Sequence, residues 1–138
     1  MRRRIIIKNA HIEKMGGGSR LVYDLQCEEN QKCPQYSLYY QVDKKYEAFL
    51  TSEVSDACVV CLLLYAMQHD LDIVSNVPIS ERLYKQLTQY LIPAISSNIK
   101  MYNPVSITAE KTNPCFNGDA VGAGLSCGVD SFTRYSKI

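Results

Sequence analysis

A chain of 138 residues, of which 46% are hydrophobic, is long enough to bury a core, and this composition excludes disorder of the whole chain. Fifteen Lys and Arg against fourteen Asp and Glu leave a formal charge of +1, so no long-range field favours nucleic acid or an anionic membrane. The basic run Arg2-Arg3-Arg4 is interpreted as a solvated N-terminal tail, because three charges are a small electrostatic footprint.

The apolar stretches are too short for export or for membrane insertion. Ile5-Ile6-Ile7 is shorter than the apolar region of a signal peptide, and the longest apolar run, residues 57–67, cannot cross a bilayer. The six cysteines lack a compact framework spacing, so reduced thiols are expected. We therefore expect a soluble, cytoplasmic protein that does not enter a membrane.

The first third of the chain predicts a small, mostly antiparallel sheet. Residues 4–13 and 20–26 read as two strands joined by a glycine-rich turn at residues 16–19. A phosphate loop is the alternative for this turn, but the residues after it prefer a strand to a helix start, which favours a hairpin. Residues 36–42 alternate as a third strand, with a turn at residues 43–45 and a partner strand at residues 46–50. The many tyrosines are assigned to a half-buried sheet face, so nucleic acid is not indicated as a partner.

Two helices are predicted in the middle of the chain. Ser52 and Ser55 offer N-caps for a buried helix at residues 56–69, which contains no Gly or Pro. Ser80 caps a second, amphipathic helix that begins at Glu81 and should end or kink near Pro93. Short strands are expected at residues 72–74 and 105–110, followed by a loop at 111–118 and an apolar strand at 120–125.

Two sets of chemically versatile residues receive structural interpretations. Cys58 and Cys61 have the CxxC spacing of a zinc or redox site, but they lie within an apolar helical run without a second pair, so buried structural thiols and no metal site are predicted. His11 and His69 are isolated in the sequence, and His69 near a helix C-terminus suits a dipole interaction better than catalysis.

The strongest chemical signal is Ser126-Cys127-Gly128-Val129-Asp130-Ser131, which follows the predicted apolar strand and precedes a stretch without helix breakers. A strand, a tight turn and a helix form an architecture that binds anions at the first amides of the helix. The segment is not a Walker A loop, because no Lys follows a glycine in the required place. The alternative is a helix start capped by Ser126 or Asp130 with no ligand.

This segment resembles the SGGxDS signature of the PP-loop ATP pyrophosphatase superfamily, whose members share an adenine nucleotide α-hydrolase-like α/β fold. Members cleave ATP to AMP and pyrophosphate, usually by adenylating a substrate before a nucleophile displaces AMP. The resemblance implies that ATP and Mg2+ are the cofactors and that Ser126, Gly128, Asp130 and Ser131 contact the pyrophosphate part of ATP. Cys127 departs from the pattern, which has glycine there.

Together these features predict an α+β or α/β fold in which residues 1–112 form an N-terminal α+β module. Residues 113–138 are expected to begin a PP-loop nucleotide-binding domain that is cut short, so this chain alone should be inactive. The parent would be an adenylating ligase or modifying enzyme with an unknown acceptor substrate. The alternative is a non-catalytic interaction module in which the motif only caps a helix. An orphaned strand at 120–125 predicts a flexible C-terminal end or self-association as a homo-oligomer.

Overall fold

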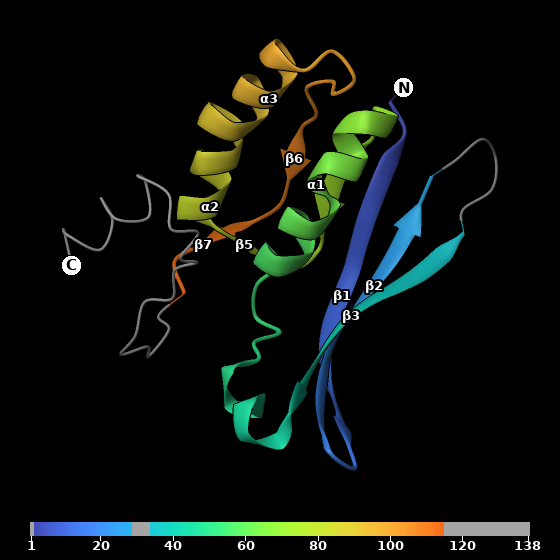
Figure 1. Ribbon diagram of the computed structural model, residues 1–138, viewed down its shortest axis with the longest axis vertical. Coiled ribbons are helices and arrows are strands. Elements are labelled where there is room, and N and C mark those ends of the chain that lie inside the picture. Colours follow the sequence, from blue (N-terminus) through green and yellow to red (C-terminus); the bar gives the residue numbers. More distant parts are fainter. Residues whose placement is uncertain (1, 29–33, 115–138) are drawn as a thin grey trace, which may run out of the picture.

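The computed structural model describes residues 2–28 and 34–114, which form a mixed α/β fold, consistent with the broad α+β class expected (Figure 1). One five-stranded sheet and three α-helices dominate it. None of the helices in these residues is long and apolar enough to span a membrane. The strands of the sheet are β1 (Arg4–Met15), β2 (Gly18–Cys27), β3 (Gln35–Asp43), β4 (Asp72–Ser75) and β6 (Ile107–Thr108), and the helices are α1 (Asp56–His69), α2 (Glu81–Gln86) and α3 (Ile92–Asn98).

The sheet has the strand order β3-β2-β1-β4-β6 and is mixed. The first three strands are antiparallel, as the alternating sequence pattern predicts, and the glycine-rich turn does form the β1–β2 hairpin. Later residues extend this sheet with parallel strands, because β1 also pairs in parallel with β4, and β4 with β6. Parallel neighbours need a crossover, which α1 supplies between the hairpin and β4, and α2 with α3 between β4 and β6.

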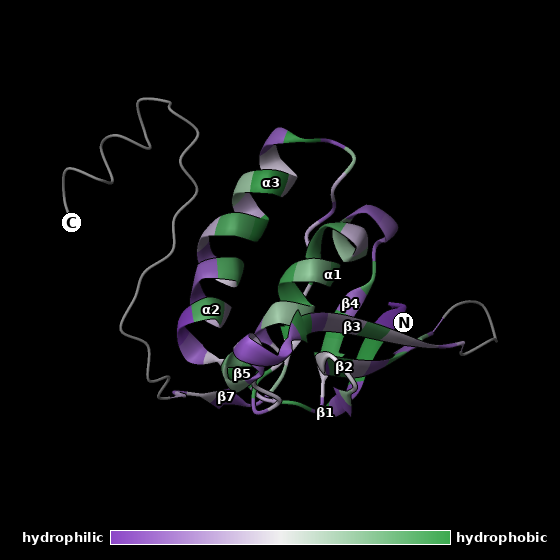
Figure 2. Ribbon diagram, turned by 60° about the horizontal axis from the view of Figure 1, so that its bottom comes forward, coloured by the Kyte–Doolittle hydropathy of each residue, from purple (hydrophilic) through white to green (hydrophobic). Residues whose placement is uncertain are grey.

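All three helices lie on one face of the sheet (Figure 2). The core between the two layers joins buried side chains of β1 and β2 to the inner face of α1 and to the helices after β4. Its fully buried members include Ile7, Tyr23, Val59, Met67 and Ile73. The other face of the sheet is uncovered within the described residues, so polar side chains can occupy it.

The segment after β3 corrects one prediction. Residues 46–50 do not form a fourth antiparallel strand; the short 3-10 helix η1 (Lys44–Phe49) stands there instead. Its residues include Lys, Glu and Ala, which favour helical backbone, and they do not alternate between apolar and polar. The hydroxyl of Ser19 donates to the Glu47 carboxylate at 2.9 Å, which attaches η1 to the start of β2.

The second helical region does not end at Pro93, which excludes one of the two expected outcomes and leaves the other, an irregularity near that residue. After α2, the π-helical turn η2 (Leu87–Leu91) leads directly into α3. Pro93 occupies the first turn of α3, where a missing backbone N–H is tolerated. The irregularity is the π-helical turn, which comes directly before the turn that contains the proline. Leu87 and Ile92, at the start of the π-helical turn and just after it, are both buried.

The end of the described chain forms a small two-stranded parallel sheet. Strand β5 (Ile79–Ser80) pairs with β7 (Lys111–Thr112), inside the region predicted to be a loop. The strand predicted at residues 105–110 is reduced to the two residues of β6. The strand predicted at 120–125 lies outside the described residues, so the proposed division at residue 112 stays a prediction.

The three N-terminal arginines are not a solvated tail, contrary to expectation. Arg2 lies 2.7 Å from the Asp70 carboxylate and 3.4 Å from that of Asp72. Arg3 donates to the His69 carbonyl at the end of α1, where a cation also suits the helix dipole. Arg4 makes two hydrogen bonds, of 2.8 and 2.9 Å, to the Glu28 carboxylate. The three arginines thus connect the N-terminal end of β1 to the end of α1 and to the residue after β2.

Candidate functional site

The residues expected to bind ATP phosphates, Ser126, Gly128, Asp130 and Ser131, all lie outside the described part of the chain. The structure describes the chain up to residue 114, shortly before these residues. Ile79 N–H donates to the Glu110 carbonyl at 2.8 Å, and the Asn113 amide donates to Glu81 at 3.3 Å. The last described residues are therefore attached beside the N-terminus of α2.

A polar junction at that place joins the first turns of α1 and α2. The Asp56 carboxylate accepts a hydrogen bond from the Ser80 backbone N–H at 2.8 Å and a second from the Ser80 hydroxyl. Ser80 thus occupies the predicted N-cap position, but its side chain bonds to Asp56 and does not cap α2. Hydrogen bonds to Lys85 and Asn113 lower the pKa of Glu81. These hydrogen bonds hold the first turns of α1 and α2 and residue 113 together.

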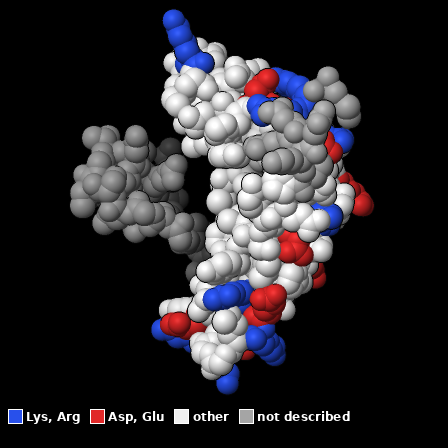
Figure 3. All heavy atoms as spheres, turned by 90° about the vertical axis from the view of Figure 1, so that its right-hand side faces the viewer, with Lys and Arg blue, Asp and Glu red and all other residues white. Residues whose placement is uncertain are grey.

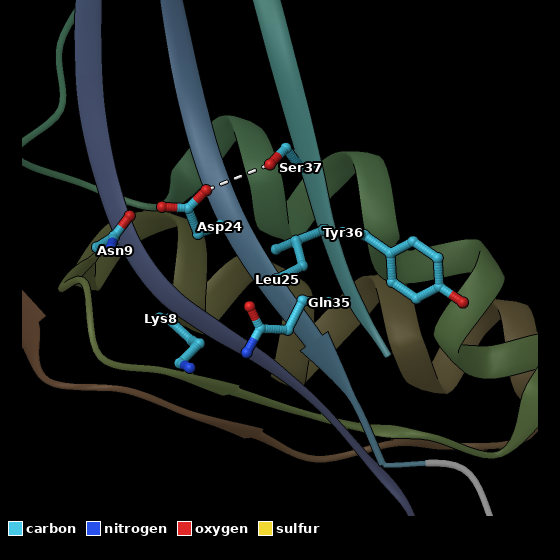
Figure 4. A pocket seen from close by; sticks show the side chains of 7 residues that line it. All are labelled: Lys8, Asn9, Asp24, Leu25, Gln35, Tyr36 and Ser37. Carbon is cyan, nitrogen blue, oxygen red and sulfur yellow. Dashed lines mark hydrogen bonds between the residues drawn. The ribbon is translucent and has the colours of Figure 1, made fainter. Parts of the chain in front are cut away.

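A shallow polar pocket of about 370 Å3 opens on the uncovered face of the sheet (Figure 4). Lys8 is the extra residue of a β-bulge, where the pairing of β1 with β2 shifts between Ile7 and Asn9. The side chains of Lys8, Asn9, Asp24 and Gln35 lie on the same side of the strands, while Tyr36 points away. An ammonium, a carboxylate and two amides can hydrogen-bond a small polar group.

This pocket does not have the geometry of a hydrolytic triad. The Ser37 hydroxyl donates to Asp24 at 3.3 Å, and the His11 Nδ1 lies 3.9 Å from the other oxygen of the same carboxylate. The carboxylate therefore stands between the serine and the imidazole, whereas a nucleophilic serine needs the imidazole beside it. His11 contacts Glu13 at 3.0 Å through its other nitrogen, and His69 packs against the Tyr65 ring.

A second pocket, of about 510 Å3, lies between η1, the end of β3 and the start of α1. Its walls are mainly aromatic and aliphatic, including Tyr23, Tyr40, Tyr46 and Phe49. The Tyr23 and Tyr40 hydroxyls donate to the carbonyls of Val54 and Ala57. Burial raises the pKa of Tyr40 to about 12 and that of Tyr23 further, so both phenols stay protonated at neutral pH. The pocket can accept an apolar ring, and the carboxylate that lines it, Asp56, accepts two hydrogen bonds from Ser80.

The two cysteines of α1 are not both buried, which corrects the sequence interpretation. Cys58 is fully buried, and burial raises the pKa of its thiol to about 12. Cys61 is exposed, and its side chain hydrogen-bonds with that of Tyr40 on β3. A helical spacing of three residues places them on neighbouring sides of the helix, but only one of them on its inner face. Among residues 2–28 and 34–114, no group of His, Cys, Asp and Glu side chains could hold a metal ion.

The chain matches no family model, no curated protein and no solved structure. Its function has to be inferred from its own residues. The two pockets described above can hold small groups. The motif at residues 126–131 lies outside the described residues, so its chemistry stays a prediction.

Proposed function

We propose that residues 113–138 carry a phosphate-binding loop of the ATP pyrophosphatase type and that the chain serves in an adenylating ligase or modifying enzyme. The observation that carries the proposal is the sequence Ser126-Cys127-Gly128-Val129-Asp130-Ser131 directly after an apolar segment. In this proposal the backbone at Gly128 approaches the phosphates and the hydroxyls of Ser126 and Ser131 donate to their oxygens. Asp130 holds Mg2+ or orders the loop.

One observation supports locating ATP binding after residue 112. The glycine-rich turn at residues 16–18, the other candidate for a phosphate loop, belongs to a β-hairpin and precedes a strand. Of the two glycine-containing candidates, the proposal therefore uses the C-terminal motif.

Cys127 is the point at which the proposal is chemically unusual. A side chain at a position where the family has glycine is strained if the backbone there needs a positive φ. A thiol close to a helix N-terminus would also be stabilised as a thiolate, which repels phosphate. The residue therefore tunes the affinity for ATP downward in this proposal, and Cys127→Gly should raise it.

A second candidate function is a protein interaction module in which the motif only caps a helix. The observation that favours it lies in the described fold, where β3 is an edge strand with exposed tyrosines, Tyr36 and Tyr39. An unprotected edge of this kind can pair with another chain.

Phosphate binding can be tested on the 138-residue chain with Mg2+ and pyrophosphate, followed by phosphorus NMR. Pyrophosphate is the appropriate probe because the motif is proposed to contact only that part of ATP. Asp130→Asn should weaken binding about tenfold or more, the loss of roughly 1.4 kcal/mol. Asp43→Asn, which changes an exposed carboxylate at the end of β3, is the matched control and should leave binding unchanged.

The outcomes separate the two candidates. Binding by the wild-type chain and the Asp43→Asn variant, with loss in Asp130→Asn, supports the phosphate loop. Binding of equal strength in all three proteins removes Asp130 from the site, and no binding by the wild-type chain favours the capping interpretation.

A further inference from the structure

Strand β3 ends one side of the sheet and leaves one backbone edge open. In the described part of the chain β3 pairs only with β2, although it is nine residues long. Natural edge strands are usually protected by charged side chains, prolines or bulges within the strand. Here Pro34 precedes β3 and Lys44 follows it, but residues 35–42 contain none of these protections. Among residues 2–28 and 34–114, nothing therefore covers this edge along residues 35–42.

The backbone groups of β3 that have no partner among the described residues belong to its odd-numbered positions. The Pro34 carbonyl accepts from Cys27 N–H at 3.1 Å, and Lys44 N–H donates to the Gly17 carbonyl at 3.2 Å, so even-numbered positions bond toward β2. In an antiparallel ladder this direction alternates along the strand. Residues 35, 37, 39, 41 and 43 therefore present their N–H and C=O groups outward, and Tyr39 lies at the midpoint of the strand.

This arrangement is self-complementary. If two copies of β3 pair antiparallel about a two-fold axis at Tyr39, every outward-facing residue meets another outward-facing residue, and the two strands overlap along their whole length. Side chains also match by face. Toward the helices Leu38 would lie opposite Tyr40, and on the open face Tyr39 would lie opposite its own copy. A shift by one residue would destroy both matches.

The surface beside the edge is also suited to its own copy. Residues 57–68 of α1 carry no charge, and Tyr65, which is 46% exposed, lies on the side of the helix that faces β3. An apolar groove of about 380 Å3 runs between this helix and β3, lined by Tyr36, Leu38 and Leu62 among others. In Figure 3, which views the molecule from the side where β2 and β3 lie, charged side chains gather at the two ends and along one margin. Because residues 35–42 and 57–68 carry no charge, two copies of this surface would not repel each other. A strongly charged partner would have no opposite charge to pair with on this surface.

We propose that β3 pairs with β3 of a second copy of this chain, forming a two-fold dimer with a continuous ten-stranded sheet and the two α1 helices on the same side. The proposal rests only on described residues and is independent of ATP binding. Tyr39 is its central residue. Tyr39 is 52% exposed and its ring stacks under Arg20, so it can be replaced without opening the core.

The test is the mass of the 138-residue chain by sedimentation equilibrium for the wild type, Tyr39→Lys and Tyr39→Glu. The wild type should have twice the 15.6 kDa of one chain. Each variant should be monomeric, because two like charges would face each other at the two-fold axis. An equimolar mixture of the two variants should restore the dimer, since Lys then faces Glu. Tyr90→Lys, which changes a tyrosine that is 69% exposed on η2, is the matched control and should remain dimeric.

Circular dichroism of each variant shows whether the variant is folded. A dimer in the mixture of Tyr39→Lys and Tyr39→Glu would show in addition that both variants are folded. A wild-type chain that stays monomeric at all concentrations would overturn the proposal and leave the edge to a different protein. A dimer that survives Tyr39→Lys would overturn it as well, because association would then use another surface.

Discussion

The two halves of the sheet are built on different principles. The antiparallel half, β1 to β3, consists of strands of 12, 10 and 9 residues that pair with their neighbours in sequence. One face of these strands is not covered by any described residues. The parallel half adds only the four residues of β4 and the two of β6. Short strands offer few backbone bonds, so their place depends on buried side chains and on the helices that cover them. Both halves contribute buried side chains to the core, but only the antiparallel half also has long backbone pairing.

The largest expected effect tests the parallel half. Ile73→Ala removes a fully buried side chain from β4, between β1 and β6, and should lower the free energy of unfolding by about 2–5 kcal/mol. The measurement is urea denaturation followed by circular dichroism. Ile12→Ala is the matched control, because Ile12 is 41% exposed near the hairpin end of β1, and it should cost less than about 1 kcal/mol. Equal losses in the two variants would contradict the contrast between the halves.

The next effect tests the backbone pairing of the antiparallel half. A Cβ added at Gly18 would lie 2.0 Å from the Val42 carbonyl oxygen, so β2 and β3 would have to move apart. Gly18→Ala should therefore destabilise the fold by about 1–3 kcal/mol. Gly16→Ala is the control, since a Cβ there meets nothing within 4 Å. Amide hydrogen exchange should show faster exchange along β3 in Gly18→Ala alone, and unchanged protection of β3 would refute the steric account.

The smallest effect concerns the ion pair that joins the start of β1 to the end of β2. The hydrogen bonds from Arg4 lower the pKa of Glu28 below its ordinary value of 4.5. Because the folded-state pKa is depressed, the pair stabilises the fold above that ordinary value, and this contribution is lost as the pH falls through the folded-state pKa. Glu28→Gln should therefore flatten the thermal stability profile below about pH 4.5. The control variant Glu53→Gln, on the loop before α1, should show the same dependence of thermal stability on pH as the wild type. If the wild type, Glu28→Gln and Glu53→Gln all show the same dependence, the ion pair does not contribute to stability.

Much of the antiparallel half and α1 could be predicted from local sequence patterns. Alternation along β1, β2 and β3, the glycines between the first two, and the unbroken apolar run of α1 are each read within a short window. The parallel half could not be found in this way. A two-residue strand such as β6 shows no periodicity, and its partner lies more than thirty residues away in the sequence.

The candidate sites also differ in whether they could be found from a short stretch of sequence. The motif at residues 126–131 is a contiguous pattern and is visible in the sequence, whereas the contacts between distant residues are not. Nothing local pairs Asp56 with Ser80, which are 24 residues apart, or brings Asp24 between Ser37 and His11. The exposure of Cys61 was missed because an apolar run does not reveal that the helix has an uncovered side.

The π turn before Pro93 has a consequence for comparing this chain with relatives. Ile92 N–H donates to the Leu87 carbonyl, five residues earlier, so the turn holds one residue more than an α-helix would. The extra residue brings Leu87 and Ile92, five positions apart, onto the same buried side. A homologue without this turn should align with a single-residue gap between positions 87 and 92, inside a continuous helix. Such a gap would mark a change of helical winding and not a loop, and it would come with the loss of the proline.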